Sequence, residues 1–166
     1  MTGVSSVKFD GKEILVFNSA IYIFEASSGL TLELDIIVSE IVLRKYQKEE
    51  NLIVEIGLED GRVIHSIMHV KALTGMLPQL HLFCEIDDIQ EYENFDRVNE
   101  NDPWFPDIEA GITLADIRKV EMPNEDVTLK LKLPIDQVEW LKAQKKSQLN
   151  EMFEKWINAH LTNMKS

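Results

Sequence analysis

Residues 126–164 constrain the fold most, because the hydrophobic pattern changes its period within this stretch. Apolar and polar residues alternate over residues 127–133, which is typical of a strand with one buried and one solvated face. Pro134 then ends the predicted strand, because it has no N–H to donate to a sheet. Over residues 136–164, apolar residues recur every three or four positions, as on one face of a helix. A helix with such a face must bury it, so we expect it to pack on the sheet.

The predicted helix would be about 40 Å long, which is comparable to the diameter of a domain of this size. Asp136 and Glu139 have the spacing of a capping box at its start. Its middle, residues 142–148, is almost wholly polar. The sequence therefore predicts a break there, or a first half that lies near the edge of the core. A third alternative is that the C-terminal half packs against a second copy of the chain.

The earlier part of the chain reads as strands joined by tight turns. Asp10-Gly11 and Asp60-Gly61 separate runs of apolar, β-branched residues, and such pairs favour two-residue hairpin turns. A further short strand is expected over residues 80–86. Residues 44–51 are charged and predict a loop, whereas residues 111–122 fit a short helix slightly better than a strand, and both alternatives stay open.

Runs of strands followed by one long helix predict an α+β protein rather than alternating strands and helices. We expect a mostly antiparallel sheet or a partly closed barrel of about six to eight strands, with the long C-terminal helix packed on it. Residues 1–166 are expected to form a single domain. Within it, residues 1–133 form the β-rich part, residues 85–110 an acidic and aromatic excursion, and residues 136–164 the helix.

The formal net charge of −12 narrows the range of partners. Nucleic acid and anionic membranes would be repelled at long range, so we expect neither as a partner, whereas a basic protein surface would be attracted. The start of the chain lacks the basic residues and the apolar core of a signal peptide, and Cys84 is the only cysteine. These features favour a cytoplasmic protein.

Residues 85–109 are the part of the sequence that most favours a binding surface. Ten carboxylates accompany a single basic residue, Arg97, and four aromatic side chains lie among them. Aromatic anchors flanked by carboxylates are suited to dock a basic protein partner. The alternative is a surface excursion whose aromatic side chains pack back on the barrel. The predicted partner-binding residues are Glu91, Tyr92, Phe95, Asp96, Asp102, Trp104 and Phe105.

Four residues of zinc-ligand type raise the question of a metal site, and they are His65, His69, His81 and Cys84. In a strand, His65 and His69 lie on one face but roughly 13 Å apart, which is too far to share one ion. His81 and Cys84 have opposite parity and should point to opposite faces. We therefore predict no metal and no cofactor, and keep these four residues only as secondary candidates.

The sequence contains no Gly-x-Ser-x-Gly nucleophile elbow and no glycine-rich phosphate loop, so it favours binding over catalysis. We expect a non-enzymatic protein-interaction module, of immunity, antitoxin-like or regulatory type, whose acidic surface binds a basic protein partner. One alternative is a small-ligand or metal-dependent activity in the mouth of the barrel. Another is a structural homo-oligomer that associates through the C-terminal helix, and its interface candidates are Met152, Phe153, Trp156 and Ile157.

Overall fold

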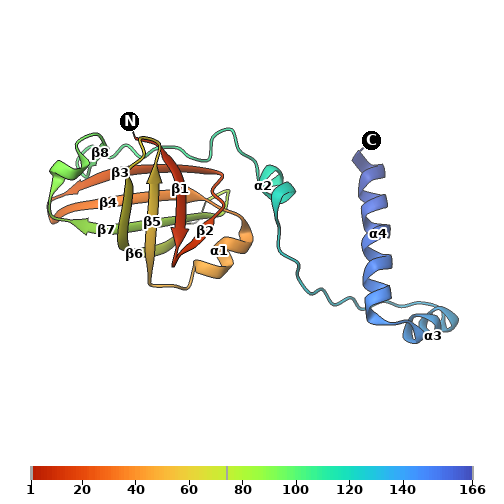
Figure 1. Ribbon diagram of the computed structural model, residues 1–166. Helices are drawn as coiled ribbons and strands as arrows, with labels where there is room; N and C mark the ends of the chain where they lie inside the picture. Colours follow the sequence, from red (N-terminus) through yellow and green to blue (C-terminus); the bar gives the residue numbers. More distant parts are fainter. Residues whose placement is uncertain (1, 74, 166) are drawn as a thin grey trace. The chain divides into compact units, whose positions relative to one another are not determined.

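Eight strands form one curled sheet in the computed structural model, in the order β2-β1-β5-β6-β7-β4-β3-β8 (Figure 1). Neighbouring strands run antiparallel except β3 and β8, which are parallel. The structure describes residues 2–73 and 75–165. The elements in chain order are β1 (Val4–Phe9), β2 (Lys12–Ile14), β3 (Asn18–Ala26), β4 (Gly29–Ile37), α1 (Glu40–Tyr46), β5 (Asn51–Leu58), β6 (Val63–Leu73), β7 (Gln79–Ile86), the 3-10 helix η1 (Ile89–Tyr92), β8 (Asp96–Asn99), α2 (Leu114–Val120), α3 (Ile135–Ala143) and α4 (Lys146–Lys165).

The chain divides into two compact units, residues 1–124 and residues 125–166, which we call the sheet unit and the terminal unit. The α+β class is confirmed, with an eight-stranded, mostly antiparallel, curled half-barrel and a long C-terminal helix. The single domain and the packing of the C-terminal helix on the sheet stay predictions.

Side chains that alternate along each strand separate a core face of the sheet from an outer face. In β4, Leu32, Leu34 and Ile36 are completely buried on the core face, and Glu33 and Asp35 alternate with them on the outer face. The larger hydrophobic cluster takes side chains from β1 to β7. In Figure 1, β3, β4 and β7 run across the direction of β1 and β5, so the curled sheet encloses this core.

Helix α2 settles the ambiguity of residues 111–122 in favour of a helix. Thr113 and Asp116 form a capping box, in which each side chain accepts a hydrogen bond from the other residue's backbone N–H. Arg118 and Lys119 lie in the last turn, where positive charge is favourable near the backbone carbonyls. Residues of the local sequence therefore stabilise both the first and the last turn of this short helix.

We expect Ile117→Val to lower the free energy of unfolding by about 1 kcal/mol, because it removes a methylene from a completely buried side chain. Ile117 packs with Ile37, Leu77 and Ile108 in a second, smaller cluster. Urea unfolding followed by circular dichroism measures the change. Val120→Ala is the control, since Val120 is 59% exposed and its truncation should cost less than about 0.5 kcal/mol. Equal effects of the two substitutions would contradict the packing of α2 on the sheet.

The predicted loop at residues 44–51 was wrong in its first part, because α1 extends to Tyr46. Ser39 caps this helix, and its Oγ accepts a hydrogen bond from the Val42 N–H at 3.2 Å. The Tyr46 ring packs edge-on against Phe9, with 4.9 Å between ring centroids. The charged residues therefore lie on the solvent side of a helix that one buried aromatic ring anchors.

Residues 127–133 do not form the predicted strand, so that prediction was wrong. The segment pairs with no strand in the part of the chain that the structure describes, and its four apolar side chains are 38% to 79% exposed. The β-rich part therefore ends with β8. A period of two fixes which side chains share a face, but a strand also needs a partner for its backbone groups.

The C-terminal helix is broken inside the polar stretch 142–148, which confirms the predicted break, because α3 ends at Ala143 and α4 begins at Lys146. The predicted capping box was wrong. Pro134 occupies the N-cap of α3 and, within the described residues, no side chain caps the helix and the Asp136 carboxylate accepts from the neighbouring Gln137 N–H alone, at 2.9 Å. Among the described residues, no helix has the length and apolar character needed to cross a membrane.

Candidate functional site

The register of four strands brings polar and aromatic side chains together on the outer face of the sheet. One row across β3, β4, β7 and β6 consists of Tyr22, Glu33, Phe83 and His69. The next row places Asp35 beside His81 and His81 beside Lys71. Cross-strand neighbours on one face have Cβ atoms about 5 Å apart, so these side chains can contact one another directly.

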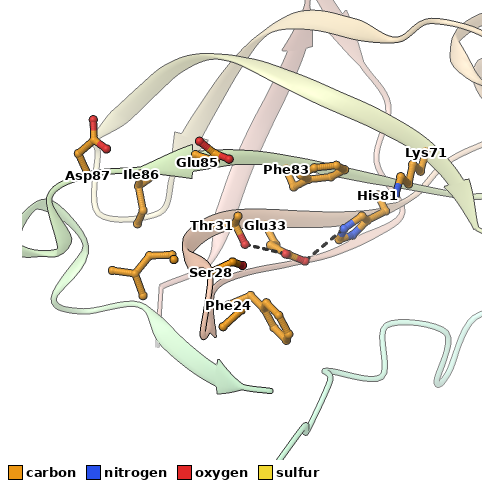
Figure 2. A pocket seen from close by; sticks show the side chains of 13 residues that line it. Phe24, Ser28, Thr31, Glu33, Lys71, His81, Phe83, Glu85, Ile86 and Asp87 are labelled. Atoms are coloured by element: carbon orange, nitrogen blue, oxygen red, sulfur yellow. Dashed lines mark hydrogen bonds and ion pairs between the residues drawn. The ribbon is translucent and has the colours of Figure 1, made fainter. Parts of the chain in front are cut away.

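A carboxylate–histidine cluster, formed by Tyr22, Glu33, Asp35 and His81, occupies the centre of this face. His81 Nδ1 lies 2.5 Å from Asp35 Oδ1, and His81 Nε2 lies 3.2 Å from Glu33 Oε2. The Tyr22 hydroxyl is 3.0 Å from Asp35 Oδ2 and 3.3 Å from Glu33 Oε2. Thr31 Oγ1 donates a hydrogen bond to Glu33 Oε1 at 2.8 Å, and Figure 2 shows the chain of contacts from Thr31 through Glu33 to His81.

The two carboxylates keep His81 protonated. Burial alone would lower the pKa of the imidazole, but hydrogen bonds and charge from Asp35 and Glu33 outweigh burial and raise this pKa to about 9. Both ring nitrogens face carboxylate oxygens, as an imidazolium with two N–H donors requires. Burial would raise the pKa of Glu33, yet hydrogen bonds from His81 and Thr31 hold it below its usual value. At neutral pH the cluster therefore contains the His81 imidazolium between two carboxyl groups, of which Glu33 is held in its charged form.

A cavity of about 460 Å³ lies beside this cluster, and we call it the acidic groove (Figure 2). Phe24 and Phe83 contribute its aromatic surface. Lys71 Nζ lies 5.2 Å from the centre of the Phe83 ring, as a cation does on the face of an aromatic ring. The groove is lined chiefly by Phe24, Glu33, Lys71, Phe83, Glu85 and Asp87, together with His81.

The segment that the sequence favoured as a binding surface meets the outer face at Phe105. The Phe105 ring lies 6.1 Å from Phe24 and 6.2 Å from Tyr22, between ring centroids. A second cavity of about 360 Å³ lies between Phe105 and the carboxylate–histidine cluster. Trp104 is 64% exposed beside it in sequence. This part of the predicted surface is therefore accessible and borders the cluster.

Other residues of that segment are placed differently. Phe95 is 5% exposed in the larger core, and Tyr92 packs edge-on against it with 5.3 Å between centroids. Glu91 and Asp102 are exposed, and Asp96 is half-buried at the start of β8. The alternative that the aromatic side chains pack back on the barrel therefore holds for Phe95 and Tyr92, and these two rings hold η1 on the sheet. A partner-binding role for the exposed residues stays a prediction.

The secondary metal candidates do not come together. His65 and His69 lie on the outer face of β6, while Cys84 lies on the core side of β7, as its parity predicted. The Ser66 hydroxyl contacts Cys84 Sγ at 3.3 Å, and burial raises the pKa of the Cys84 thiol. Within residues 2–73 and 75–165, no group of three or more His, Cys, Asp or Glu side chains is arranged to hold a metal ion.

The oligomer-interface candidates lie on α4 in the terminal unit. Met152, Phe153, Trp156 and Ile157 are 40%, 37%, 64% and 46% exposed. The side chains are accessible for the proposed association, and the homo-oligomer stays a prediction.

Sequence reasoning missed Tyr22, Glu33 and Asp35 as site residues. The available signal was a strand in which Thr31, Glu33 and Asp35 alternate with fully buried leucine and isoleucine. A single polar residue at an outward position of a strand is ordinary. Carboxylates at two successive outward positions instead indicate that a positively charged group lies beside them.

Comparison with known proteins gives no relative for this chain. No protein-family model, no curated protein and no solved structure matches it. The chemistry of the outer face is therefore the basis of a functional proposal.

Proposed function

We propose that this chain is a non-enzymatic protein-binding module whose acidic groove receives a basic side chain of a partner protein. The groove itself carries this proposal. Glu33, Glu85 and Asp87 contribute negative charge, and Phe24 and Phe83 contribute ring surfaces on which a cation is stabilised. Lys71 already lies over Phe83 and the His81 imidazolium also lines the groove, so the groove holds two cations of its own chain against these three carboxylates.

The distribution of charge between the two units supports this proposal. The sheet unit carries 23 acidic and 10 basic side chains, a formal charge of −13, and the terminal unit carries 6 acidic and 7 basic side chains, a formal charge of +1. The sheet unit therefore accounts for the acidity of the whole chain. A negative potential of this size speeds the approach of a basic surface and weakens with added salt.

The protonation of the cluster favours binding over acid–base catalysis. An imidazolium with a pKa of about 9 has no lone pair to accept a proton at neutral pH. Glu33 is likewise held in its charged form, since its pKa lies below the usual value. Fixed charges of this kind orient a charged ligand, whereas a general base needs a pKa near the working pH.

The test is binding of a short fluorescent peptide in which lysine alternates with valine, measured by anisotropy at low salt. We expect Glu85→Lys with Asp87→Lys to weaken this binding at least tenfold, because the change places two positive charges in the groove. A peptide in which glutamate replaces lysine should not bind.

The matched control is Glu49→Lys with Glu50→Lys, which changes the net charge equally at two exposed positions before β5. We expect this control to weaken binding much less. Equal losses in the two double variants would show that the peptide responds to overall charge, and the groove would then not be the binding site.

A further inference from the structure

The terminal unit, residues 125–166, has no buried core of its own. Among its side chains that the structure describes, those of residues 125–164, none is buried, and twelve large apolar ones are more than a third exposed. Folding units of fewer than about 70 residues bury little apolar surface, and many rely on disulfides, metals or oligomerisation. Cys84, the only cysteine, lies outside this unit, and none of the described residues belongs to a group that could hold a metal ion. Association with a further surface is then the means of burying these side chains.

Helix α4 gathers much of this apolar surface on one side. Two rows of side chains, one starting at Leu149 and one at Met152, have a member every four residues and lie next to each other along the helix. We call the two rows together the α4 face, and its members are Leu149, Met152, Phe153, Trp156, Ile157, His160, Leu161 and Met164. The His160 ring belongs to this face because it stacks on Trp156, with 5.6 Å between ring centroids.

Charged side chains lie outside the α4 face. Between residues 147 and 164 they are Glu151, Glu154 and Lys155, all at helical positions away from the two rows. Lys155 Nζ and Glu151 Oε1 form an ion pair at 2.9 Å, so these two charges are already matched within the helix. A surface that covers the α4 face therefore buries no formal charge of α4 at neutral pH, apart from any proton carried by His160.

The spacing of the α4 face is the same in both directions along the helix. Successive members are three, one, three, one, three, one and three residues apart, which is symmetric about the point between Trp156 and Ile157. If two copies of α4 cross antiparallel on a two-fold axis at that point, Met152 lies opposite Leu161 of the second copy and Phe153 lies opposite its His160. Two-fold contacts require such self-complementarity, and rows four residues apart interlock with like rows. Neither a sheet nor an unrelated helix requires this symmetry, so the spacing favours a second copy as the occupant.

Charge also favours the terminal unit as the place where two copies meet. Its six acidic and seven basic side chains give a formal charge of +1, so two terminal units scarcely repel each other. Two sheet units, each with a formal charge of −13, repel each other strongly at low salt.

A cavity beside the α4 face extends the apolar surface that a second copy can cover. Its volume is about 580 Å³, and its walls are Leu131, Leu133, Asp136, Gln137, Trp140, Leu141 and Phe153. Phe153 is also a member of the α4 face, so the cavity borders this face. Leu131 and Leu133, which no strand pairing covers, therefore lie beside the same surface.

We infer that the α4 face is a homodimer interface, in which α4 of two copies packs antiparallel about a two-fold axis between Trp156 and Ile157. Each copy thereby supplies the apolar surface that the other lacks. The α4 face shares no residue with the acidic groove, so this association goes beyond the proposed function and does not depend on it.

Sedimentation equilibrium of the full chain at micromolar concentration tests the association. We expect a dimer, and we expect Ile157→Asp to raise its dissociation constant at least tenfold, because the change places two carboxylates beside the two-fold axis. Val127→Asp is the matched control, since it makes the same kind of change at a 79% exposed position outside the α4 face, and it should leave the dimer nearly unchanged. A chain that is monomeric throughout, or a dimer that Ile157→Asp leaves intact, would overturn the inference.

Dilution of the unaltered chain gives a second measurement that needs no substitution. A helix of this length is marginal without tertiary packing, so the helix content measured by circular dichroism should fall as the dimer dissociates. A helix content that is the same at every concentration, while the dimer dissociates, would show that α4 is held within its own chain, which would overturn the inferred occupant.

Distances between spin labels on the two copies test the antiparallel arrangement. Gln148→Cys and Asn158→Cys, made in separate chains that also carry Cys84→Ala, place one label per copy outside the α4 face. Gln148 lies more than eight residues from the two-fold axis and Asn158 fewer than two, so the label separation should be longer at Gln148 by about 10 Å or more. Equal separations at the two positions would indicate a parallel pair and overturn the inferred arrangement.

Discussion

Replacing His81 with alanine is expected to lower the free energy of unfolding by about 3 kcal/mol. The substitution leaves the carboxylates of Glu33 and Asp35 on adjacent outward positions of β4 without the cation between them. Their side chains are only 12% and 8% exposed, so water screens them poorly. Removing one partner of a buried charge cluster costs more than the cluster contributes in total, because the remaining charges stay desolvated. Urea unfolding at neutral pH measures the loss.

The control for this substitution is His65→Ala on the outer face of β6. The His65 side chain is 69% exposed and lies 3.8 Å from a Glu55 oxygen, so its removal should cost less than about 0.5 kcal/mol. Adding Asp35→Asn to His81→Ala should recover part of the lost stability, since it removes one of the two opposed negative charges. A loss with His81→Ala no larger than that with His65→Ala would contradict the stabilising role of the cluster.

The second large effect is a loss of stability at alkaline pH. The pKa of His81 is about 9 in the folded chain, against an ordinary value of 6.5, so the folded state holds the proton more tightly. This contribution to stability is fully present below pH 6.5 and is lost as the pH rises through 9, and it amounts to roughly 3 kcal/mol. Unfolding measured across this range at constant ionic strength should show the decline. An NMR titration of the His81 ring should have its midpoint near pH 9.

The His81→Ala chain identifies the group that causes this decline. Other groups that ionise in the same range are present in both chains, so the difference between the two stability curves isolates His81. A decline of equal size in both chains would assign the effect to another group. On the acid side, Glu33 has a lowered pKa, so its contribution is present above its ordinary value of 4.5 and is lost as the pH falls.

Much of the fold could be predicted because it follows from local chemistry. Asp10 and Gly11 adopt positive φ angles of 49° and 83°, as the Asp-Gly pair predicted for the turn between β1 and β2. Alternation along β4 likewise identified the buried face. The helix α1 was missed because its charged residues, Glu40, Arg44 and Lys45, are as many as the residues that pack on the core, Val42, Leu43 and Tyr46. Residues 127–133 are the reverse case, in which a strand was predicted and none forms, because an alternating pattern does not supply a strand to pair with.

The candidate site could not be predicted, because it depends on the register between distant strands. Asp35 and His81 are 46 residues apart in the chain and become direct neighbours only in the β4–β7 ladder. A shift of this ladder by one residue would turn His81 toward the core and separate the charges. The acidic and aromatic segment was visible in composition, yet only Trp104 and Phe105 of its aromatic residues are exposed.

The β4–β7 ladder has a consequence for the order in which the chain folds. The β3–β4 hairpin and the β5-β6-β7 meander each form between neighbouring segments, whereas the β4–β7 ladder joins them across α1. Closing this long loop costs chain entropy before any contact between the two halves is gained. The ion pairs between His81 and the two carboxylates lie on this ladder, so they form only when the halves meet. Until then Glu33 and Asp35 lie on β4 without a cation between them, and the union of the two halves is the step that brings the His81 imidazolium to them.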